Sequence, residues 1–577
     1  MTTAPSTGST HPDGWWRSSV VYQIYPRSFA DSNGDGVGDI PGVTSRLDYL
    51  HQLGVDVVWL SPVYASPMDD NGYDISDYTD VDPLFGRLAD LDALIAGLHQ
   101  RGMKLVMDLV VNHTSDEHAW FVESRDPASA KRDWYWWRAP RPGAEPARPG
   151  AEPGAEPTNW ESAFSGPAWT YDEASGEYYL HLFSPKQPDL NWENPEVRQA
   201  VYAMMNWWVD RGVDGFRMDV INLISKPEML RDGAVAAGQR YASGIAEVGN
   251  GHRLDEFLAE MNSAVGLSAR NLLTVGEMPG ATIDTAQSVT DPARHELDMV
   301  FTFEHVWLDT KPGGSKWDPQ PSGLPALKQN LAEWQVGLAD VGWNSLYWDN
   351  HDQPRAVSRF GDDSPEHRVN SAKTLATVQH MHRGTPYVYQ GEELGMTNTR
   401  FADISAYRDI ESVNYYTEAL SLGMEAATVL ASIAPRSRDN ARTPVQWDDT
   451  SQAGFTEGIP WLPVNPNYVT INAAAAVADP DSVFHHFRRL IALRHEQPVI
   501  VDGRFELLLG DHEQIWALTR TSGSQVLVML ANCSSQLAVV AAGSVPDLAG
   551  ALTLLTTHGD TTSAALQPWE SRIYLLG

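Results

Sequence analysis

Apolar strands that alternate with amphipathic helices constrain the fold of this chain more than any other feature. The strand-like segments are apolar along almost their whole length, which is typical of a parallel sheet covered by helices. Helix-like stretches lie between them, for example at 42–54, 88–102, 195–212, 324–341, 367–384 and 481–499. Eight strands are expected, at 19–29, 55–62, 103–113, 215–220, 272–278, 299–304, 344–349 and 386–393. This pattern predicts an α/β fold, a (β/α)8 TIM barrel.

Two regions depart from the alternation. After the third strand comes a Trp-rich excursion that contains near-repeats of PGAEP (138–160) and ends with strand character at 178–192. The repeats cannot form a core and are expected to be a mobile surface loop. Beyond residue 502, short strands separated by turn residues predict an antiparallel β domain. The predicted domains are therefore a barrel (1–113 and 189–501), an excursion (114–188) and a C-terminal β domain (502–577).

The charge balance limits the partners. A formal net charge of −34 argues against nucleic acid or an anionic membrane and fits a neutral small ligand. The first residues, MTTAPSTGSTHPDGWW, lack the basic and apolar blocks of a signal peptide, and no apolar run is long enough to cross a bilayer. Cys533 is the only cysteine, so no intrachain disulfide can form. We therefore expect a cytoplasmic protein, either a monomer or a small homo-oligomer.

Polar side chains gather at the carboxyl ends of the predicted strands. In a barrel of this kind, these strand ends form the face that carries the active site. They bring carboxylates, two histidines and an arginine to one rim. The residues are Asp108, Asn112, His113, Arg217, Asp219, Glu277, His351 and Asp352.

Such a set matches retaining glycoside hydrolysis, in which one carboxylate attacks and a second, about 5–5.5 Å away, acts as acid and then base. Asp219 lies two residues from Arg217 on the same side of a strand, which favours an ionised nucleophile. Glu277 lies in the apolar run VGEMPG with no adjacent cation, which favours the proton-bearing role. The alternatives are a structural Arg–Asp pair and a metal site, which would leave Arg217 without a role.

The loop DSNGDGVGD (31–39) has the spacing of a calcium loop. Oxygen ligands recur at alternate positions with Gly36 at the sharp turn. Gly42 stands where an EF-hand has its bidentate Glu, so a true EF-hand is not expected. We expect a structural calcium ion, with magnesium as the alternative ion and a polar Asx turn as the alternative structure; catalysis itself requires no cofactor. The expected ligands are Asp31, Asn33, Asp35, the Val37 carbonyl and Asp39.

Five motifs resemble those of the α-amylase family of glycoside hydrolases (family 13). They are DLVVNH (108–113), QPDLN (187–191), GFRMDV (215–220), VGEM (275–278) and NHDQPR (350–355). The resemblance implies that Asp219 is the nucleophile, Glu277 the acid/base and Asp352 the transition-state stabiliser. It also implies that the excursion is the family's B domain and that the C-terminal region is its β-sandwich C domain. The residues it places at the sugar of the cleavage subsite are Tyr73, His113, Phe183, Arg217 and His351.

Within the family, the chain is most similar to oligo-1,6-glucosidases and dextran glucosidases. DDNGYDISDY (69–78) and RDNARTPVQW (438–447) resemble their exo-acting signature, in which Asp70 and Arg438 would hold the non-reducing terminal glucose. The 31–39 loop resembles the calcium site of this subgroup. We therefore expect an exo-acting retaining α-glucosidase that cleaves isomaltose and short isomalto-oligosaccharides through a covalent glucosyl-enzyme.

Val220, directly after the nucleophile, bears on the linkage that is cleaved. The resemblance associates Val at this position with α-1,6 preference, and Thr or a small residue with α-1,4 preference. A branched side chain there narrows the entry to the next subsite, and an α-1,6 bond has an extra methylene that can swing past it. The chain also departs from the relatives at two places. The PGAEP repeats lengthen a loop of the B domain, so no subsites for longer substrates are predicted, and Asp349 stands where relatives often have Asn, with no predicted effect.

Several other activities stay open. Trehalose-6-phosphate hydrolases share a run like DVINLISK (219–226) but usually carry Ala or Thr at the position of Pro188. Sucrose isomerases carry an Arg-rich loop after strand six, whereas EHVWLDTKPGG (304–314) has no arginine. An α-1,4 preference and transglucosylation are further alternatives, the latter because water and sugar compete for the same glucosyl-enzyme. A non-catalytic barrel would be expected to lose a catalytic carboxylate, and none is missing.

Overall fold

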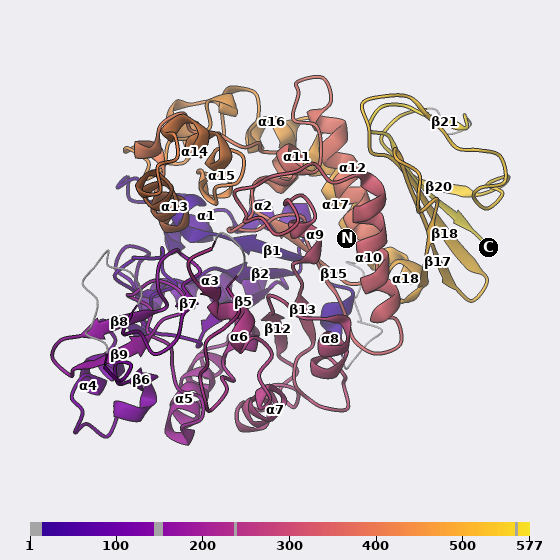
Figure 1. The fold of residues 1–577 in the computed structure, drawn as a ribbon. Helices are drawn as coiled ribbons and strands as arrows, with labels where there is room; N and C mark the ends of the chain where they lie inside the picture. The colour runs from indigo at the N-terminus through magenta and orange to yellow at the C-terminus, as the bar shows by residue number, and fades with distance from the viewer. Residues whose placement is uncertain (1–13, 144–153, 236–238, 560–562) are drawn as a thin grey trace.

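Eight parallel strands form a ring at the centre of the computed structural model, which describes residues 14–143, 154–235, 239–559 and 563–577 (Figure 1). Neighbours in the ring follow the order of the chain, and a parallel bridge from Val300 to Asn344 closes it. Each strand matches a predicted one, so the predicted (β/α)8 barrel is confirmed. The strands are β1 (Val21–Ile24), β2 (Val57–Leu60), β5 (Lys104–Val110), β10 (Gly215–Asp219), β12 (Leu273–Glu277), β13 (Met299–Phe301), β14 (Ser345–Leu346) and β15 (Thr385–Tyr389).

The strands are shorter than the apolar runs that predict them. β1 stops before Pro26, which begins a 3-10 turn and has no N–H group for the ladder. β14 keeps only two residues of the predicted 344–349. Every residue of β1, β2, β10 and β12 is buried, which explains why these runs are apolar without alternation.

Helices cover the outside of the ring and return the chain to the start of the next strand. The beginning of α5 illustrates the local signals: the Asn194 side chain accepts the N–H of Glu196, and Pro195 takes the first helical position, where no N–H is needed. The main barrel helices are α1 (Ile40–Ser45), α2 (Leu47–Leu53), α3 (Leu88–Gln100), α5 (Pro195–Asp210), α7 (Leu254–Val265), α8 (Ile283–Val289), α10 (Leu324–Gly337), α12 (Arg368–Met381) and α17 (Val483–Glu496).

The chain leaves the barrel between β5 and α5. This excursion lies at the lower left of Figure 1 and contains a helix and a small antiparallel sheet. The elements are α4 (Ala119–Ser124), β6 (Trp137–Arg138), β8 (Trp169–Asp172) and β9 (Glu177–Leu180). Strand character was predicted at 178–192, but the strand found there, β9, already ends at Leu180.

The last PGAEP copy packs against the excursion. Most of the repeat segment, 144–153, lies outside the described residues, including the loop predicted to be mobile. Ala155 in the last copy is fully buried in the same apolar cluster as Trp160 and Val220. The prediction that the repeats contribute nothing to a core is therefore wrong for this copy, because a methyl group is small enough to fill a gap beside a tryptophan ring.

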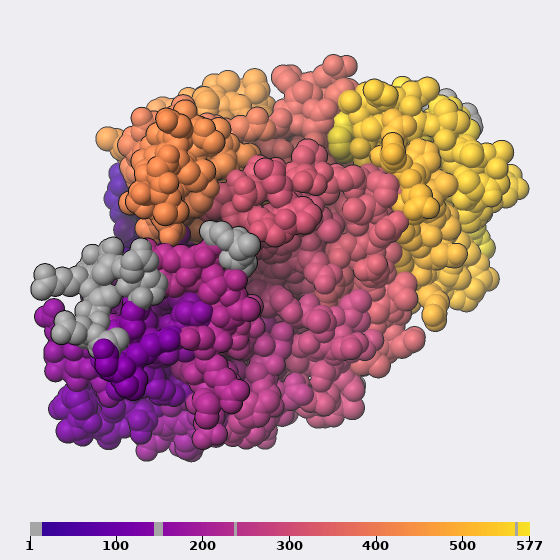
Figure 2. Space-filling view, viewed as in Figure 1, coloured from indigo at the N-terminus to yellow at the C-terminus, as the bar shows by residue number. Residues whose placement is uncertain are grey.

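The C-terminal region forms antiparallel sheets, as predicted, at one side of the barrel, in yellow in Figures 1 and 2. The larger sheet has the order β16-β17-β18-β22-β20, and β20 was not predicted. The predicted strand at 537–543 is reduced to β19, which pairs with β21. The strands are β16 (Arg504–Leu508), β17 (Ile515–Ser522), β18 (Gln525–Asn532), β19 (Ala538–Val539), β20 (Leu552–Thr556), β21 (Ala565–Leu566) and β22 (Ser571–Leu576).

A buried lysine connects the barrel to these sheets. Lys328 on α10 is fully buried, and its ammonium donates to the carbonyl oxygens of Leu509, His512 and Ile515 at 2.6, 2.6 and 3.0 Å. These carbonyls belong to the turn between β16 and β17. An ammonium group has three N–H donors. All three N–H groups of Lys328 are hydrogen-bonded to this turn, which fixes α10 against the C-terminal sheet.

Four helices lie outside the regular alternation and were not predicted. They are α9 (Glu304–Trp307), α13 (Ile410–Ser421), α14 (Ala426–Ile433) and α15 (Asp439–Arg442). Three of them, α9, α13 and α15, carry residues of the site described below. Within the described ranges, no helix combines the length and apolarity needed to span a membrane.

Candidate active site

One arginine joins the ends of three neighbouring barrel strands. Arg217 on β10 is 1% exposed, and its Nη1 lies 2.6 Å from Asp219 Oδ1 and 2.8 Å from Asp108 Oδ1. Its Nη2 lies 2.6 Å from Glu277 Oε2 at the end of β12. A guanidinium group presents its donors in a rigid, planar fork. Asp219 and Glu277 are therefore held side by side, one on each arm of the same group.

The prediction that Glu277 has no cation beside it is wrong. The local sequence VGEMPG contains none, but Arg217 reaches Glu277 from the adjacent strand, because Arg217 on β10 lies beside Val275 on β12. Glu277 still favours the protonated form. Burial raises the pKa of Glu277 to about 7, against the opposing effect of Arg217.

Asp219 is buried beside the same cation. Burial raises the pKa of Asp219 to about 7 as well, against Arg217, and the nearby Asp108 carboxylate adds to the rise. Arg217 contacts Asp219 directly, so this guanidinium favours the ionised form of the carboxylate that must attack.

Asp352 has the opposite electrostatics. It follows β14, and its Oδ2 lies 3.0 Å from His351 Nε2. Its Oδ1 lies 3.2 Å from Arg438 Nη1 and 2.8 Å from Arg442 Nη2. Burial would raise the pKa of Asp352, but His351 and the two arginines hold it well below its usual value. Asp352 therefore stays ionised while Glu277 titrates.

Rings surround the carboxylates. Tyr73 stacks on His351 with centroids 5.2 Å apart and planes within 3°, and its hydroxyl donates to Asp108 Oδ2 at 3.0 Å. His113 Nε2 lies 3.1 Å from the Tyr73 carbonyl oxygen, and the Phe183 ring is 5.2 Å from the His113 ring. Burial lowers the pKa of His113 to about 4, so this imidazole is neutral. The residues expected at the cleavage subsite thus form one connected cluster.

Asp70 and Arg438 form a buried ion pair. Arg438 Nη2 lies 3.3 Å from Asp70 Oδ1, and the two residues are 6% and 5% exposed. Arg438 also lies 2.6 Å from Asp409 Oδ1. Burial raises the pKa of Asp70 to about 7, while Arg438 acts in the opposite direction. The pair joins segments 368 residues apart, so it fixes the loop that carries Asp70 to the start of α15.

Val220 has a strained backbone. Its φ of +36° and ψ of +42° lie in the left-handed region, which a β-branched residue rarely adopts. This conformation directs its N–H to Glu277 Oε2 at 3.1 Å. The side chain is 7% exposed and lines the adjoining cavity. Val220 therefore positions the acid with its backbone and shapes the entry with its side chain.

A cavity of about 210 Å³ lies beside the carboxylates. Glu277 and Asp352 are on its wall, and much of the remaining lining is apolar. Each cation that lines it is paired with a carboxylate in the described part of the chain, which suits a neutral, partly apolar ligand. The pairs are Lys316 with Glu411, Arg359 and Arg436 with Asp309, and Arg438 with Asp70, Asp352 and Asp409.

A fully buried lysine lies behind His113. Lys226 Nζ is 2.9 Å from Asp189 Oδ2 and donates to Asn112 Oδ1 at 2.9 Å. The Asn112 amide lies 3.3 Å from His113 Nδ1. The end of β5, the end of the excursion and the turn after β10 are therefore held together by one ammonium group.

Arg442 and Asp409 were missed at the sequence level. Arg442 is fully buried and contacts Asp352 as well as the His351 carbonyl, to which its Nε donates at 2.9 Å. The sequence does contain a signal for Arg442. Arg438 and Arg442 lie four residues apart and therefore on one face of a helix, so a site that includes Arg438 could also include Arg442. Asp409 had no comparable signal, because its partner Arg438 comes from another segment.

The 31–39 loop is folded by its own side chains. The Asp31 carboxylate accepts the N–H groups of Asn33, Gly34 and Gly36 at 2.8–2.9 Å. The side chains of Asn33 and Asp35 each accept the N–H two residues later, which is the geometry of Asx turns. In the described residues, no group of three or more Asp, Glu, His or Cys side chains is placed to hold a metal ion.

Asp39 has a different role from the other residues of this loop. It is 3% exposed, and its Oδ1 accepts the Gly42 N–H at 2.6 Å as the cap of α1. Its Oδ2 accepts the hydroxyl and the N–H of Ser32. The side-chain oxygens of Asp31, Asn33 and Asp35 also accept N–H groups within the loop, but carboxylate, amide and carbonyl oxygens of this kind are the ligands that a hard cation prefers.

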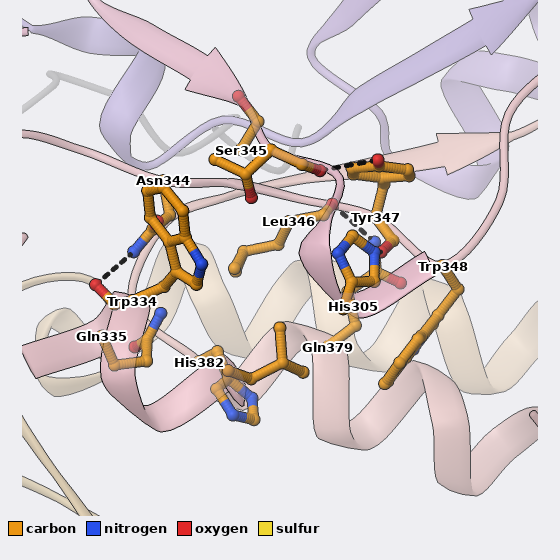
Figure 3. A pocket seen from close by; sticks show the side chains of 12 residues that line it. His305, Trp334, Gln335, Asn344, Ser345, Leu346, Tyr347, Trp348, Gln379 and His382 are labelled. Atoms are coloured by element: carbon orange, nitrogen blue, oxygen red, sulfur yellow. Dashed lines mark hydrogen bonds between the residues drawn. The ribbon is translucent and has the colours of Figure 1, made fainter. Parts of the chain in front are cut away.

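A second cavity lies away from the carboxylates, between β14, α10 and α12 (Figure 3). His305, Trp334, Tyr347 and His382 are among the residues that line it, and its volume is about 30 Å³. That space holds a water molecule but no sugar. No carboxylate is among its described lining residues. It is therefore part of the packing around the barrel and not a substrate site.

The geometry supports acid–base and nucleophilic chemistry at one carbon. Two carboxyls held by one guanidinium, both with pKa values raised to about 7, lie near a third carboxyl that remains ionised, all at the carboxyl ends of barrel strands. A retaining glycosidase requires these catalytic groups, a carboxylate nucleophile and a carboxyl acid/base.

Comparisons with known proteins agree with this assignment. Residues 23–503 match the family model of the alpha-amylase catalytic domain. The chain is 56% identical to an oligo-1,6-glucosidase from Parageobacillus thermoglucosidasius, over 97% of this chain and 98% of that protein. It is 55% identical to one from Halalkalibacterium halodurans, over 97% and 99%. The crystal structure of trehalose-6-phosphate hydrolase from Bacillus licheniformis superposes with a TM-score of 0.89 at 45% identity, over 98% of this chain and 100% of that one. The chain belongs to the α-amylase family of glycoside hydrolases.

Proposed function

We propose that this protein is an exo-acting, retaining α-glucosidase that prefers α-1,6 linkages, with isomaltose and short isomalto-oligosaccharides as substrates. The observation that carries the proposal is the single guanidinium of Arg217, which holds Asp219 and Glu277 side by side at the end of the barrel. The high identity to relatives named oligo-1,6-glucosidase supports the linkage and the substrate class.

In the first step, the Asp219 carboxylate attacks the anomeric carbon while Glu277 protonates the departing glycosidic oxygen. The carbon–oxygen bond to the leaving sugar breaks, and a covalent glucosyl ester forms on Asp219. In the second step, the Glu277 carboxylate takes a proton from water, which attacks the same carbon and releases Asp219. Two inversions retain the α configuration.

Asp352 and the Asp70–Arg438 pair hold the terminal glucose. The ionised Asp352 stabilises positive charge as it develops on the sugar ring. Asp70 and Arg438 present a buried carboxylate and guanidinium to the hydroxyls of the non-reducing end, where no further sugar unit can be accommodated. That accounts for exo action.

The α-1,6 preference is assigned to Val220. Its branched side chain lines the cavity next to Glu277, so it crowds a leaving sugar that is attached directly through a ring carbon. An α-1,6 linkage interposes a methylene group with an additional rotatable bond, which lets the leaving sugar avoid this side chain.

The test is a comparison of initial rates on isomaltose, maltose, sucrose, trehalose and trehalose 6-phosphate. We expect isomaltose to be the best substrate and the product to appear first as α-glucose by NMR. Asp219→Asn is the control and should lose at least ~1,000-fold in kcat with the fold intact. A product that appears first as the β-anomer would refute the retaining mechanism.

Trehalose-6-phosphate hydrolysis is the second candidate, because a structure with that activity superposes closely on this chain. Paired cations argue against it. Lys316, Arg359, Arg436 and Arg438 all line the cavity. Each is paired with a described carboxylate, with Arg359 and Arg436 sharing Asp309, so none is an unpaired cation free to bind a phosphate group. Faster hydrolysis of trehalose 6-phosphate than of isomaltose would favour this candidate.

A structural calcium ion is proposed at the 31–39 loop. Asp31, Asn33, Asp35 and the Val37 carbonyl would hold it, while Asp39 caps α1. We expect the melting temperature to rise on addition of calcium and to fall with EDTA. Asp35→Ala should remove this response, and Asp48→Ala, at an exposed residue on α2, should keep it. An equal response in both variants would place the ion elsewhere.

Cellular location and assembly are also proposed from the sequence: a cytoplasmic protein that is a monomer or a small homo-oligomer. Cell fractionation and light scattering test these two points.

A further inference from the structure

Trp307 is unusual among the aromatic residues of this protein. It is 50% exposed, and no other Trp, Tyr or Phe in the described ranges belongs to the exposed class. It ends the short helix α9 and lines the same cavity as Glu277 and Asp352. An indole ring buries a large apolar area when it finds a partner, so the exposed ring of Trp307 offers that area to a ligand in this cavity.

The depth of the lining residues places Trp307 at the mouth of the cavity. Glu277 is 6% exposed and Asp352 is half-buried, whereas Trp307 is 50% exposed. The terminal glucose lies at the deep end, where Asp70 and Arg438 are buried. The leaving portion of a substrate must therefore extend outward, toward Trp307.

No packing role accounts for this ring. Among the described residues it takes part in none of the ring–ring or cation–π contacts, which engage Trp16, Trp317 and Trp343 elsewhere. Phe303 and Ile245, which also line the cavity, add apolar surface on the same wall. An unpartnered flat ring on the wall of a sugar site is suited to stacking against the apolar face of a pyranose.

We infer that Trp307 is a stacking platform for the second glucosyl unit of the leaving group, and so sets the preference for chain length. This rests on the proposed function. The terminal glucose and the first leaving unit fill the space between the Asp70–Arg438 pair and Val220. A third unit, present in isomaltotriose but not in isomaltose, reaches the exposed ring.

The experiment compares Trp307→Ala and Trp307→Phe with the wild-type protein on p-nitrophenyl α-glucoside, isomaltose, isomaltotriose and isomaltotetraose. For Trp307→Ala we expect kcat/KM to fall about five- to tenfold on the two longer substrates. The fall should be expressed mainly in KM. Isomaltose and p-nitrophenyl α-glucoside should change less than about twofold. Trp307→Phe, which keeps a flat ring, should restore most of the loss.

Val336→Ala is the matched control, since Val336 is exposed on α10 and does not line the cavity. It should leave all four rates unchanged. Equal losses on every substrate in Trp307→Ala, or no loss on any, would overturn the inference. The wild-type rates report separately on the proposed function: failure to cleave isomaltose refutes that proposal, and the ratio between long and short substrates tests Trp307.

Discussion

At the scale of single residues, the protonation of Glu277 controls the pH dependence. Burial raises the pKa of Glu277 to about 7, and only its protonated form can donate to the leaving oxygen. Activity should therefore fall as the pH rises above about 7, approaching tenfold per pH unit. Asp352 adds no limb in this range, because its pKa lies well below the usual value.

A pH profile of kcat/KM on isomaltose measures this limb. The control is Glu277→Gln, which has no proton to lose. It should be slow on isomaltose, and its residual activity should lack the alkaline limb. A wild-type profile that stays flat to pH 9 would contradict the assignment of Glu277 as the acid.

Val220 makes a second prediction at this scale. Val220→Ala removes the branch beside Glu277 and eases a left-handed conformation that costs a β-branched residue about 1–3 kcal/mol. We expect the ratio of maltose to isomaltose activity to rise, with no loss of melting temperature. Val220→Thr keeps the branch and the strain but adds a polar atom, so it separates shape from polarity. An unchanged ratio in Val220→Ala, or an equal rise in Val220→Thr, would refute the steric account.

The sequence allows the carboxylates to be predicted, but not their coupling. Asp219 and Glu277 end apolar strands, and barrel geometry brings strand ends together whatever the intervening chain. That Arg217 contacts both depends on the pairing of β10 with β12, which no local pattern reveals. The strain at Val220 was likewise not predictable, because it depends on the turn that follows β10.

At the scale of elements, Lys328 holds α10 to the turn between β16 and β17. Lys328→Met keeps most of the length of the side chain but removes the ammonium donor from three carbonyl oxygens, of which that of Leu509 still accepts the N–H of His512. We expect a loss of about 2–4 kcal/mol in the free energy of unfolding. Calorimetry measures it, with Lys311→Met at an exposed lysine as the control. Equal melting temperatures for the two variants would show that the contact adds no stability.

Elements with strong periodicity were predictable, and those defined by tertiary contacts were not. The eight strands are apolar throughout because helices cover them, so they are recognisable without the structure. α13 and α14 escaped prediction because few of their side chains are buried, and the buried apolar ones pack in one cluster with Trp317 and Tyr407. β20 escaped because it lies at the edge of its sheet and is only partly buried.

At the scale of the whole molecule, the net charge of −34 sets how substrates approach. A neutral disaccharide feels no long-range field, so kcat/KM on isomaltose should change less than about twofold between about 20 mM and about 0.5 M salt. Trehalose 6-phosphate is anionic, so any activity on it should rise as salt screens the repulsion. Stopped assays at matched pH measure both. A strong salt effect on isomaltose would reveal a charged step in its binding.

The ring of strands is not joined equally all the way round. β13 and β14 meet through the single bridge from Val300 to Asn344, whereas β10 and β5 pair along five residues. Transient opening of the barrel should therefore begin at this seam, and amide hydrogens there should exchange with solvent before those of β10. α9 follows β13 directly and carries Trp307. Transient separation of β13 from β14 would therefore displace the part of the active-site cavity wall that α9 forms, while Arg217 keeps its contacts with Asp108, Asp219 and Glu277.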